Sequence, residues 1–92
     1  MAHLEFEWDP RKASANLRKH GVSFEEAVGV FSDEHAKLLD DPDHSKDEER
    51  FVLLGLSAAL RLLVVVHCCR ESQDTIRLIS ARKATRAEQA FY

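Results

Sequence analysis

Three apolar runs of strand length in the second half of the chain constrain its fold more than any other feature. The runs are Phe51–Leu56, Leu62–Cys68 and Thr75–Ser80, and all are rich in Val, Leu or Ile. The segments that join them, Ser57–Leu60 and Glu71–Asp74, are too short for the crossover that parallel strands require. The three runs are therefore predicted to form an antiparallel meander.

The first half of the chain begins with a pattern of another kind. Leu4–Trp8 alternates apolar with acidic residues, which is the period of a half-buried strand. Asp9 and Pro10 are residue types that begin a helix, and Gly21 is one that ends it. We expect a first helix over residues 10–20.

A second helix and a short strand should follow. Ser23 and Glu26 have the spacing of a capping box, which predicts a helix over residues 24–32. Ala36–Leu39 is a candidate strand, and Asp40–Ser45 is dense in turn-forming residues.

The end of the chain repeats the capping signature. Thr85 and Glu88 have the same spacing, which predicts a short last helix through Phe91. Because strands follow strands, the order β-α-α-β-β-β-β-α predicts an α+β fold. A chain of 92 residues with two prolines and three glycines leaves no room for a linker, so residues 1–92 are expected to form one domain.

Several classes of protein and site are disfavoured by the residues. Met1–Glu7 is not the basic and then apolar start of a signal peptide, and the longest apolar run, Leu62–Val66, is far shorter than a membrane span, so we expect a cytoplasmic protein without a membrane partner. Cys68 and Cys69 are adjacent on a predicted strand and point to opposite faces, which disfavours a disulfide between them and a zinc site with His67. We expect neither a metal nor a cofactor.

The charge is unevenly distributed along the chain. The net charge is −3, yet residues 33–49 carry −6 and residues 50–92 carry +4. The basic residues of the second part fall mostly at strand ends, where surface positions converge. Metal-free RNA cleavage needs cations near the phosphate together with an acid and a base, and Arg, His, Glu and Tyr can supply them. The alternative for each arginine is an ordinary surface ion pair of about 0–1 kcal/mol.

The sequence resembles the BrnT family of type II toxins over almost its whole length. The matching segments are Phe6–Asp9, Lys19–Ala27, Glu48–Phe51, Arg61–Val66 and Ile76–Ala84. The resemblance implies a RelE-like fold, with two N-terminal helices packed on an antiparallel sheet and a short C-terminal helix. It also implies an RNA-cleaving activity that arrests growth. It also implies a BrnA-like antitoxin that blocks the toxin and supplies the DNA-binding domain of the pair, so that DNA is contacted only through the antitoxin.

The polar positions that match the family pattern lead to a site hypothesis. Arg61 and Arg82 would stabilise the phosphorane, with His20 or Glu49 as acid or base, although His20 could equally serve as a partner of the helix dipole. The product would carry a 2′,3′-cyclic phosphate. The residues expected to hold the RNA are Lys19, Arg50, Arg77 and Tyr92.

Two other functions stay open at this point. In the first, the fold is kept but the positive surface only receives an antitoxin segment, without enzymatic activity. In the second, the chain binds DNA directly, which is disfavoured because no predicted helix has a basic face suited to a major groove.

Overall fold

The computed structural model describes residues 4–39, 50–69 and 74–92. The predicted loop Asp40–Ser45, the candidate residue Glu49 and most of the predicted turn Glu71–Asp74 lie outside these ranges. The described elements, in chain order, are β1 (Glu5–Glu7), α1 (Pro10–His20), α2 (Phe24–Gly29), the 3₁₀ helix η1 (Val30–Ser32), β2 (Lys37–Leu39), β3 (Phe51–Leu56), β4 (Leu62–Cys69), β5 (Thr75–Lys83) and α3 (Arg86–Gln89).

The element order agrees with the predicted one, and most boundaries agree within a few residues. The predicted helix over 24–32 divides into α2 and one 3₁₀ turn, and the predicted last helix ends at Gln89. The third strand of the meander is longer than predicted and reaches Lys83. A register shift at Val66/His67 gives β5 one extra residue within its pairing with β4.

The strands form a five-stranded sheet in the order β1-β5-β4-β3-β2. Strands β2 to β5 pair antiparallel, as predicted for the meander. The prediction of a wholly antiparallel sheet is wrong, because β1 pairs parallel to β5, with Phe6 opposite Ile76. Short connections impose antiparallel pairing on β3, β4 and β5, whereas the long chain between β1 and β5 allows either direction.

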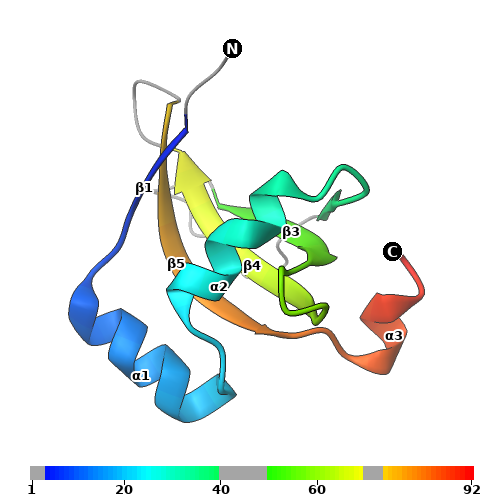
Figure 1. Cartoon of the computed structure of the whole chain (residues 1–92), viewed down its shortest axis with the longest axis horizontal. Helices are drawn as coiled ribbons and strands as arrows, with labels where there is room; N and C mark the ends of the chain where they lie inside the picture. The colour runs from blue at the N-terminus through cyan, green and yellow to red at the C-terminus, as the bar shows by residue number, and fades with distance from the viewer. Residues whose placement is uncertain (1–3, 40–49, 70–73) are drawn as a thin grey trace.

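Helices α1 and α2 cover one face of this sheet, which we call the helix face. Figure 1 shows α2 crossing in front of the sheet, with α1 beside it. Leu63 and Val65 of β4 pack in one apolar cluster with Phe24 and Ala27 of α2. Periodicity alone left open which face the helices cover, and this cluster answers the question.

The opposite face, which we call the second face, has a smaller apolar cluster. Val52, Leu54 and Val64 form it, with Ala84 packed against its side. Residues directly opposite one another in a sheet share a face, so Arg82, opposite Val64, lies on the second face, and Lys83, opposite Leu63, lies on the helix face.

Local chemistry explains where α1 begins, ends and docks. The Asp9 side chain accepts a hydrogen bond from the backbone N–H of Arg11 at 2.8 Å, and Gly21 ends the helix in the left-handed conformation at φ 70°. The buried Asn16 donates to the carbonyls of Val22 and Ala81 and accepts from the Ala81 N–H. This amide therefore joins α1 both to the following turn and to β5.

The two ends of the sheet differ in what they hold. We call the end where β3 and β5 finish and β4 begins the Arg61 end, because Arg61 immediately precedes β4. The other is the Arg50 end, where Arg50 immediately precedes β3. Among the described helices, none is long and apolar enough to cross a membrane.

Candidate active site

The candidate site is built around an ion pair at the Arg61 end of the sheet. Both Nε and Nη2 of Arg61 donate to the Glu26 carboxylate, Nε to Oε2 at 2.9 Å and Nη2 to Oε1. Nη2 also donates to the carbonyl of Gly21 at 3.1 Å. The guanidinium is thus fixed along one edge, and its Nη1 group has no partner in the described part of the chain. A planar group held in this way can present its two remaining N–H groups to an anion.

The turn between β3 and β4 sets the position of Arg61. The Ser57 N–H donates to the Arg61 carbonyl at 2.9 Å, and the Leu60 N–H donates to the Ser57 carbonyl at 2.9 Å. Leu60 adopts φ 62°, a left-handed conformation that costs a branched residue about 1–2 kcal/mol. Strained backbone of this kind is frequent beside functional groups.

Ser57 connects this turn to α2. Its buried hydroxyl donates to Oε2 of Glu26 at 2.7 Å and accepts from the Arg61 N–H at 3.3 Å. The hydrogen bond from Arg61 is the main cause that lowers the pKa of Glu26 below its ordinary value, and Ser57 and the charge of Lys83 lower it further, against the opposing effect of burial. Glu26 is therefore ionised at neutral pH.

The capping box predicted for α2 forms only in part. The Ser23 side chain caps the helix as expected, accepting from the Glu26 N–H at 3.0 Å. The Glu26 carboxylate, however, points to Arg61 and Ser57. A spacing of three residues indicates a local bond, and it carries no information about a partner 35 positions away.

Arg82 has a carboxylate partner of its own. Its Nη1 and Nη2 donate to the two oxygens of Glu88 at 2.7 and 2.8 Å. The hydrogen bonds from Arg82 are the main cause that lowers the pKa of Glu88 to about 2. Both arginines thus lie at the Arg61 end, but Arg61 lies on the helix face and Arg82 on the second face.

Three further candidates also lie at this end. Lys19 and His20 form the last turn of α1, next to Gly21, whose carbonyl Arg61 contacts. The Tyr92 hydroxyl donates to Oδ2 of Asp33 at 2.6 Å, and the same oxygen accepts from the N–H of Leu56 at the end of β3.

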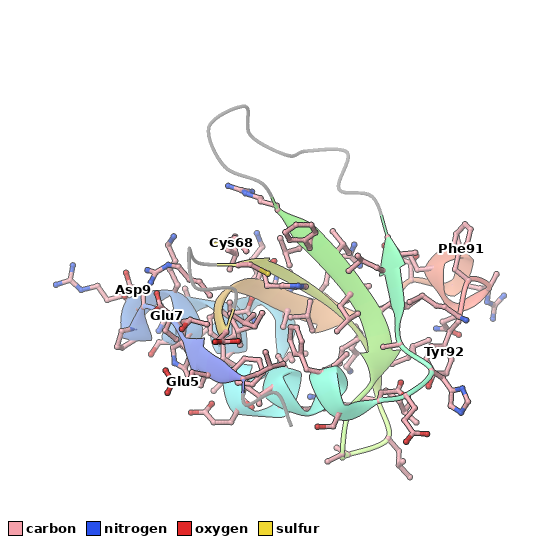
Figure 2. All side chains as sticks on the ribbon, turned by 90° about the horizontal axis from the view of Figure 1, so that it is seen from above. Glu5, Glu7, Asp9, Cys68, Phe91 and Tyr92 are labelled. Atoms are coloured by element: carbon pink, nitrogen blue, oxygen red, sulfur yellow. The ribbon has the colours of Figure 1, made fainter. Side chains whose placement is uncertain are left out.

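The remaining described candidates lie elsewhere. Arg50 is at the opposite end of the sheet, and its Nε is buried and has no hydrogen-bond partner among residues 4–39, 50–69 and 74–92. Arg77 is on the second face and pairs with Glu7 of β1 at 2.9 Å. Figure 2 shows Glu7 and Tyr92 on opposite sides of the molecule, so Arg77 and Tyr92 do not share one pocket.

Sequence reasoning missed the functional positions that complete these contacts, Glu26, Ser57 and Lys83. Lys83 was recognised as a basic residue of the last strand, but its proximity to Glu26 depends on the face that it shares with Leu63. Glu26 and Ser57 lie in segments that match the family pattern, but as single residues they indicated only helix capping and a turn.

A metal site finds no support in the described ranges. No group of three or more His, Cys, Asp or Glu residues there is arranged to hold an ion. His67 is buried between the rings of Phe31 and Phe51, and burial lowers its pKa. Cys68 is buried and Cys69 exposed, which agrees with the prediction that they point to opposite faces.

Comparisons with known proteins give a family match and a fold match. Residues 8–88 match the family model described as the ribonuclease toxin BrnT of type II toxin–antitoxin systems. The fold is similar to the crystal structure of the Brucella abortus ribonuclease toxin BrnT, with a TM-score of 0.69 at 22% identity over 90% of this chain and 99% of the other. No curated protein sequence matches the chain significantly.

Proposed function

The chain belongs to the BrnT family of ribonuclease toxins of type II toxin–antitoxin systems, and from this premise we propose that it cleaves RNA at the Arg61 end of its sheet without a metal ion. The observation that carries the proposal is the fixed guanidinium of Arg61, whose Nη1 is open while its other edge is held by Glu26. The last turn of α1 supplies positive charge beside it through Lys19.

The proposed reaction is an internal transesterification of the RNA. The ribose 2′-oxygen attacks the adjacent phosphorus, the bond to the 5′-oxygen breaks, and a 2′,3′-cyclic phosphate remains. Arg61 stabilises the charge that develops on the phosphorane, a contribution of several kcal/mol for a preorganised donor. Arg82 acts on the same strand of RNA from the second face, and His20 serves as acid or base. Glu49 is not used in this proposal, because it is next in sequence to Arg50, which lies at the opposite end of the sheet.

RNA binding in this proposal extends beyond the cleavage point. Arg77 and Arg82 share the second face of β5, and their partners on β4, Cys68 and Val64, are four residues apart, which corresponds to about 13 Å at 3.3 Å per residue. An RNA strand that passes round the Arg61 end meets Arg82 and then Arg77. Tyr92 and Lys19 contact the RNA near the cleavage point, and Arg50 contacts it at the far end.

The biological setting follows from the family. An antitoxin neutralises the toxin, and we propose that it is BrnA-like and provides the DNA contact of the pair. Cleavage of cytoplasmic RNA arrests growth. The helices on one face of the sheet support a RelE-like classification, which superposition on solved RelE-like toxins tests.

Replacement of Arg61 provides the direct test. Arg61→Ala should lower the cleavage rate of purified protein on RNA by about 10²–10³-fold, as for loss of one transition-state donor. Arg11→Ala, at the opposite end of α1, is the matched control and should cleave normally. Cleavage should persist in excess EDTA and leave a cyclic phosphate detectable by mass spectrometry. A folded Arg61→Ala variant with full activity would refute the assignment.

One observation favours a non-enzymatic alternative. Both arginines proposed to act on phosphate are already paired with carboxylates, Arg61 with Glu26 and Arg82 with Glu88. A surface neutralised in this way could serve only to receive an antitoxin segment. Wild-type protein that leaves RNA intact, both alone and with ribosomes, while still binding its antitoxin would establish that alternative.

A further inference from the structure

Glu26 occupies a position that the ion pair alone does not explain. Its carboxylate is only partly buried, with the side chain 16% exposed, and it holds the Nε–Nη2 edge of Arg61, whose side chain is 32% exposed. A buried structural pair would close both groups off from solvent. Here both partners of the pair remain accessible at the same place.

The hydrogen bonds of Glu26 leave its carboxylate with capacity to spare. A carboxylate can accept about four hydrogen bonds. Within the described part of the chain it accepts three: Arg61 Nη2 donates to Oε1, and Arg61 Nε and the Ser57 hydroxyl donate to Oε2. Oε1 therefore keeps one lone pair that can accept a proton from a bound molecule.

We propose that Glu26 is the general base of the reaction, its carboxylate taking the proton of the ribose 2′-hydroxyl while Nη1 of Arg61 binds the phosphate that this hydroxyl attacks. The inference rests on the proposed ribonuclease function. It assigns the base to a residue on α2, and it leaves His20, beside Gly21, as the acid.

The proton and electron balance of this step is complete without a further reactant. The 2′-O–H proton moves to Oε1 of Glu26, the 2′-oxygen forms a bond to phosphorus, and the bond from phosphorus to the 5′-oxygen breaks. A proton from His20 neutralises the leaving 5′-oxygen. Water then returns one proton to His20 and accepts the proton held by Glu26.

The charges facing Glu26 explain how an acidic carboxyl can act as this base. Arg61, from the β3–β4 turn, and Lys83, from β5, are the cations that face Glu26. They keep it ionised before substrate binds, so the base form is fully available at neutral pH. When a phosphate binds Arg61, its negative charge offsets the guanidinium, and the affinity of Glu26 for a proton rises at the moment of attack.

The first experiment compares two adjacent glutamates of α2. Glu26→Gln should slow single-turnover cleavage of an RNA oligonucleotide by about 10²–10⁴-fold, the range for loss of a positioned base. The matched control is Glu25→Gln, since Glu25 is exposed on the same helix and lies outside the site, and it should cleave at the wild-type rate. Equal rates for the two variants, with both proteins folded, would overturn the proposal.

A second readout separates a base from a residue that merely orients Arg61. Formate added to Glu26→Ala should restore part of the cleavage rate, because a free carboxylate can replace the missing base. It should not rescue Arg61→Ala. If Glu26→Ala is slow and formate has no effect on it, the role of Glu26 is limited to positioning and the base assignment fails.

A third measurement does not depend on whether Glu26 variants fold. The wild-type rate should fall at low pH as the base is protonated. Ser57→Ala removes a hydrogen bond that lowers the pKa of Glu26, so the acidic inflection should move to higher pH. An unmoved inflection would count against Glu26. Wild-type protein with no cleavage at any pH would instead refute the ribonuclease function itself.

Discussion

Asp33 shows how single side chains at the Arg61 end join segments that are far apart in the sequence. Its Oδ2 accepts from the Leu56 N–H at 2.8 Å and from the Tyr92 hydroxyl, and its Oδ1 accepts from the His35 N–H at 2.9 Å. The hydrogen bond from Leu56 is the main cause that lowers the pKa of Asp33. One carboxylate thus ties η1 to the end of β3 and to the end of the chain.

Close packing around Gly55, in the same region of the fold, leaves no space for a side chain there, and mutation can test this. A Cβ atom at Gly55 would lie 2.7 Å from Cγ1 of Val30 and 3.0 Å from Cβ of Ala36. We expect Gly55→Ala to lower the free energy of unfolding by about 1–3 kcal/mol, measured by urea denaturation, because η1 must move away from β3.

Gly29→Ala is the control for this substitution. A Cβ at Gly29 meets its nearest atom, the Ala58 nitrogen, at an ordinary 3.6 Å. Gly29 lies at the end of α2 with helical φ, so this change should raise stability by roughly 0.5–1 kcal/mol. If both variants had the same stability, close packing at Gly55 would not be the reason for glycine there.

The limits of sequence reasoning are clearest for single residues. Arginine and histidine types at strand and helix ends indicated Arg61, Arg82 and His20, and all three lie at one end of the sheet. Their partners were not predictable, because Glu26 and Glu88 have their own local capping signals. Only the folded register brings Glu26 to Arg61.

At the scale of elements, helix α3 depends on contacts with the rest of the fold for its stability. It has four residues, and isolated helices of this length are unstable in water. The Thr85–Glu88 capping box is complete, as predicted, and Arg82 binds the same carboxylate. Tyr92 anchors the segment that follows. Glu88 therefore joins α3 to β5.

The ionisation of Glu88 should make this junction sensitive to acid. The folded pKa of about 2 lies below the ordinary 4.5, so the stabilisation is complete above pH 4.5 and disappears as the pH falls towards 2. Glu88→Gln should lower the free energy of unfolding at pH 7 by about 1–2 kcal/mol, a value reduced for screening of a partly exposed pair.

The measurement is the difference in unfolding free energy between wild type and Glu88→Gln as a function of pH. It should shrink between pH 4.5 and 2, since the other carboxyl groups are common to both proteins. Glu34→Gln, an exposed control outside the pair, should follow wild type. A difference that stays constant over this pH range would show that Glu88 stabilises α3 by packing alone.

The elements themselves were predictable to different degrees for a physical reason. Helix α1 and strands β3, β4 and β5 have strong local signals and short connections, so their existence and pairing follow from the sequence. The direction of β1 depends on contacts with β5, some 70 residues away, which no local pattern encodes. The helix face was ambiguous because β4 is apolar on both sides, with Val64 and Val65 equally suited to burial.

At the scale of the whole molecule, the arginine proposed to cleave RNA and the arginines proposed to bind it further along lie on different faces of the sheet. In the proposed mechanism Arg61 acts on the helix face at the cleavage point, and the RNA continues past Arg82 and Arg77 along the second face. The excess of +4 over residues 50–92 lets a protein of net charge −3 attract a polyanion at this surface. Binding that depends on several phosphate contacts should weaken steeply with salt.

This path makes the effect of Arg77 depend on the length of the RNA. About 13 Å separates Arg77 from Arg82, or about four stacked nucleotides at roughly 3.4 Å each. A dinucleotide bound at Arg61 is too short to reach Arg77. We therefore expect Arg77→Ala to raise the KM for a long single-stranded RNA several-fold, by loss of one phosphate contact, and to leave dinucleotide cleavage unchanged.

Glu7 provides the control that separates RNA binding from folding, because it is the partner of Arg77 across β1 and β5. Glu7→Gln weakens the same ion pair but leaves the cation in place, so it should keep or lower the KM for long RNA. If Glu7→Gln and Arg77→Ala raised the KM equally, the pair would matter only for holding β1 on the sheet. The RNA path along the second face would then be wrong, while cleavage at Arg61 would be unaffected by that result.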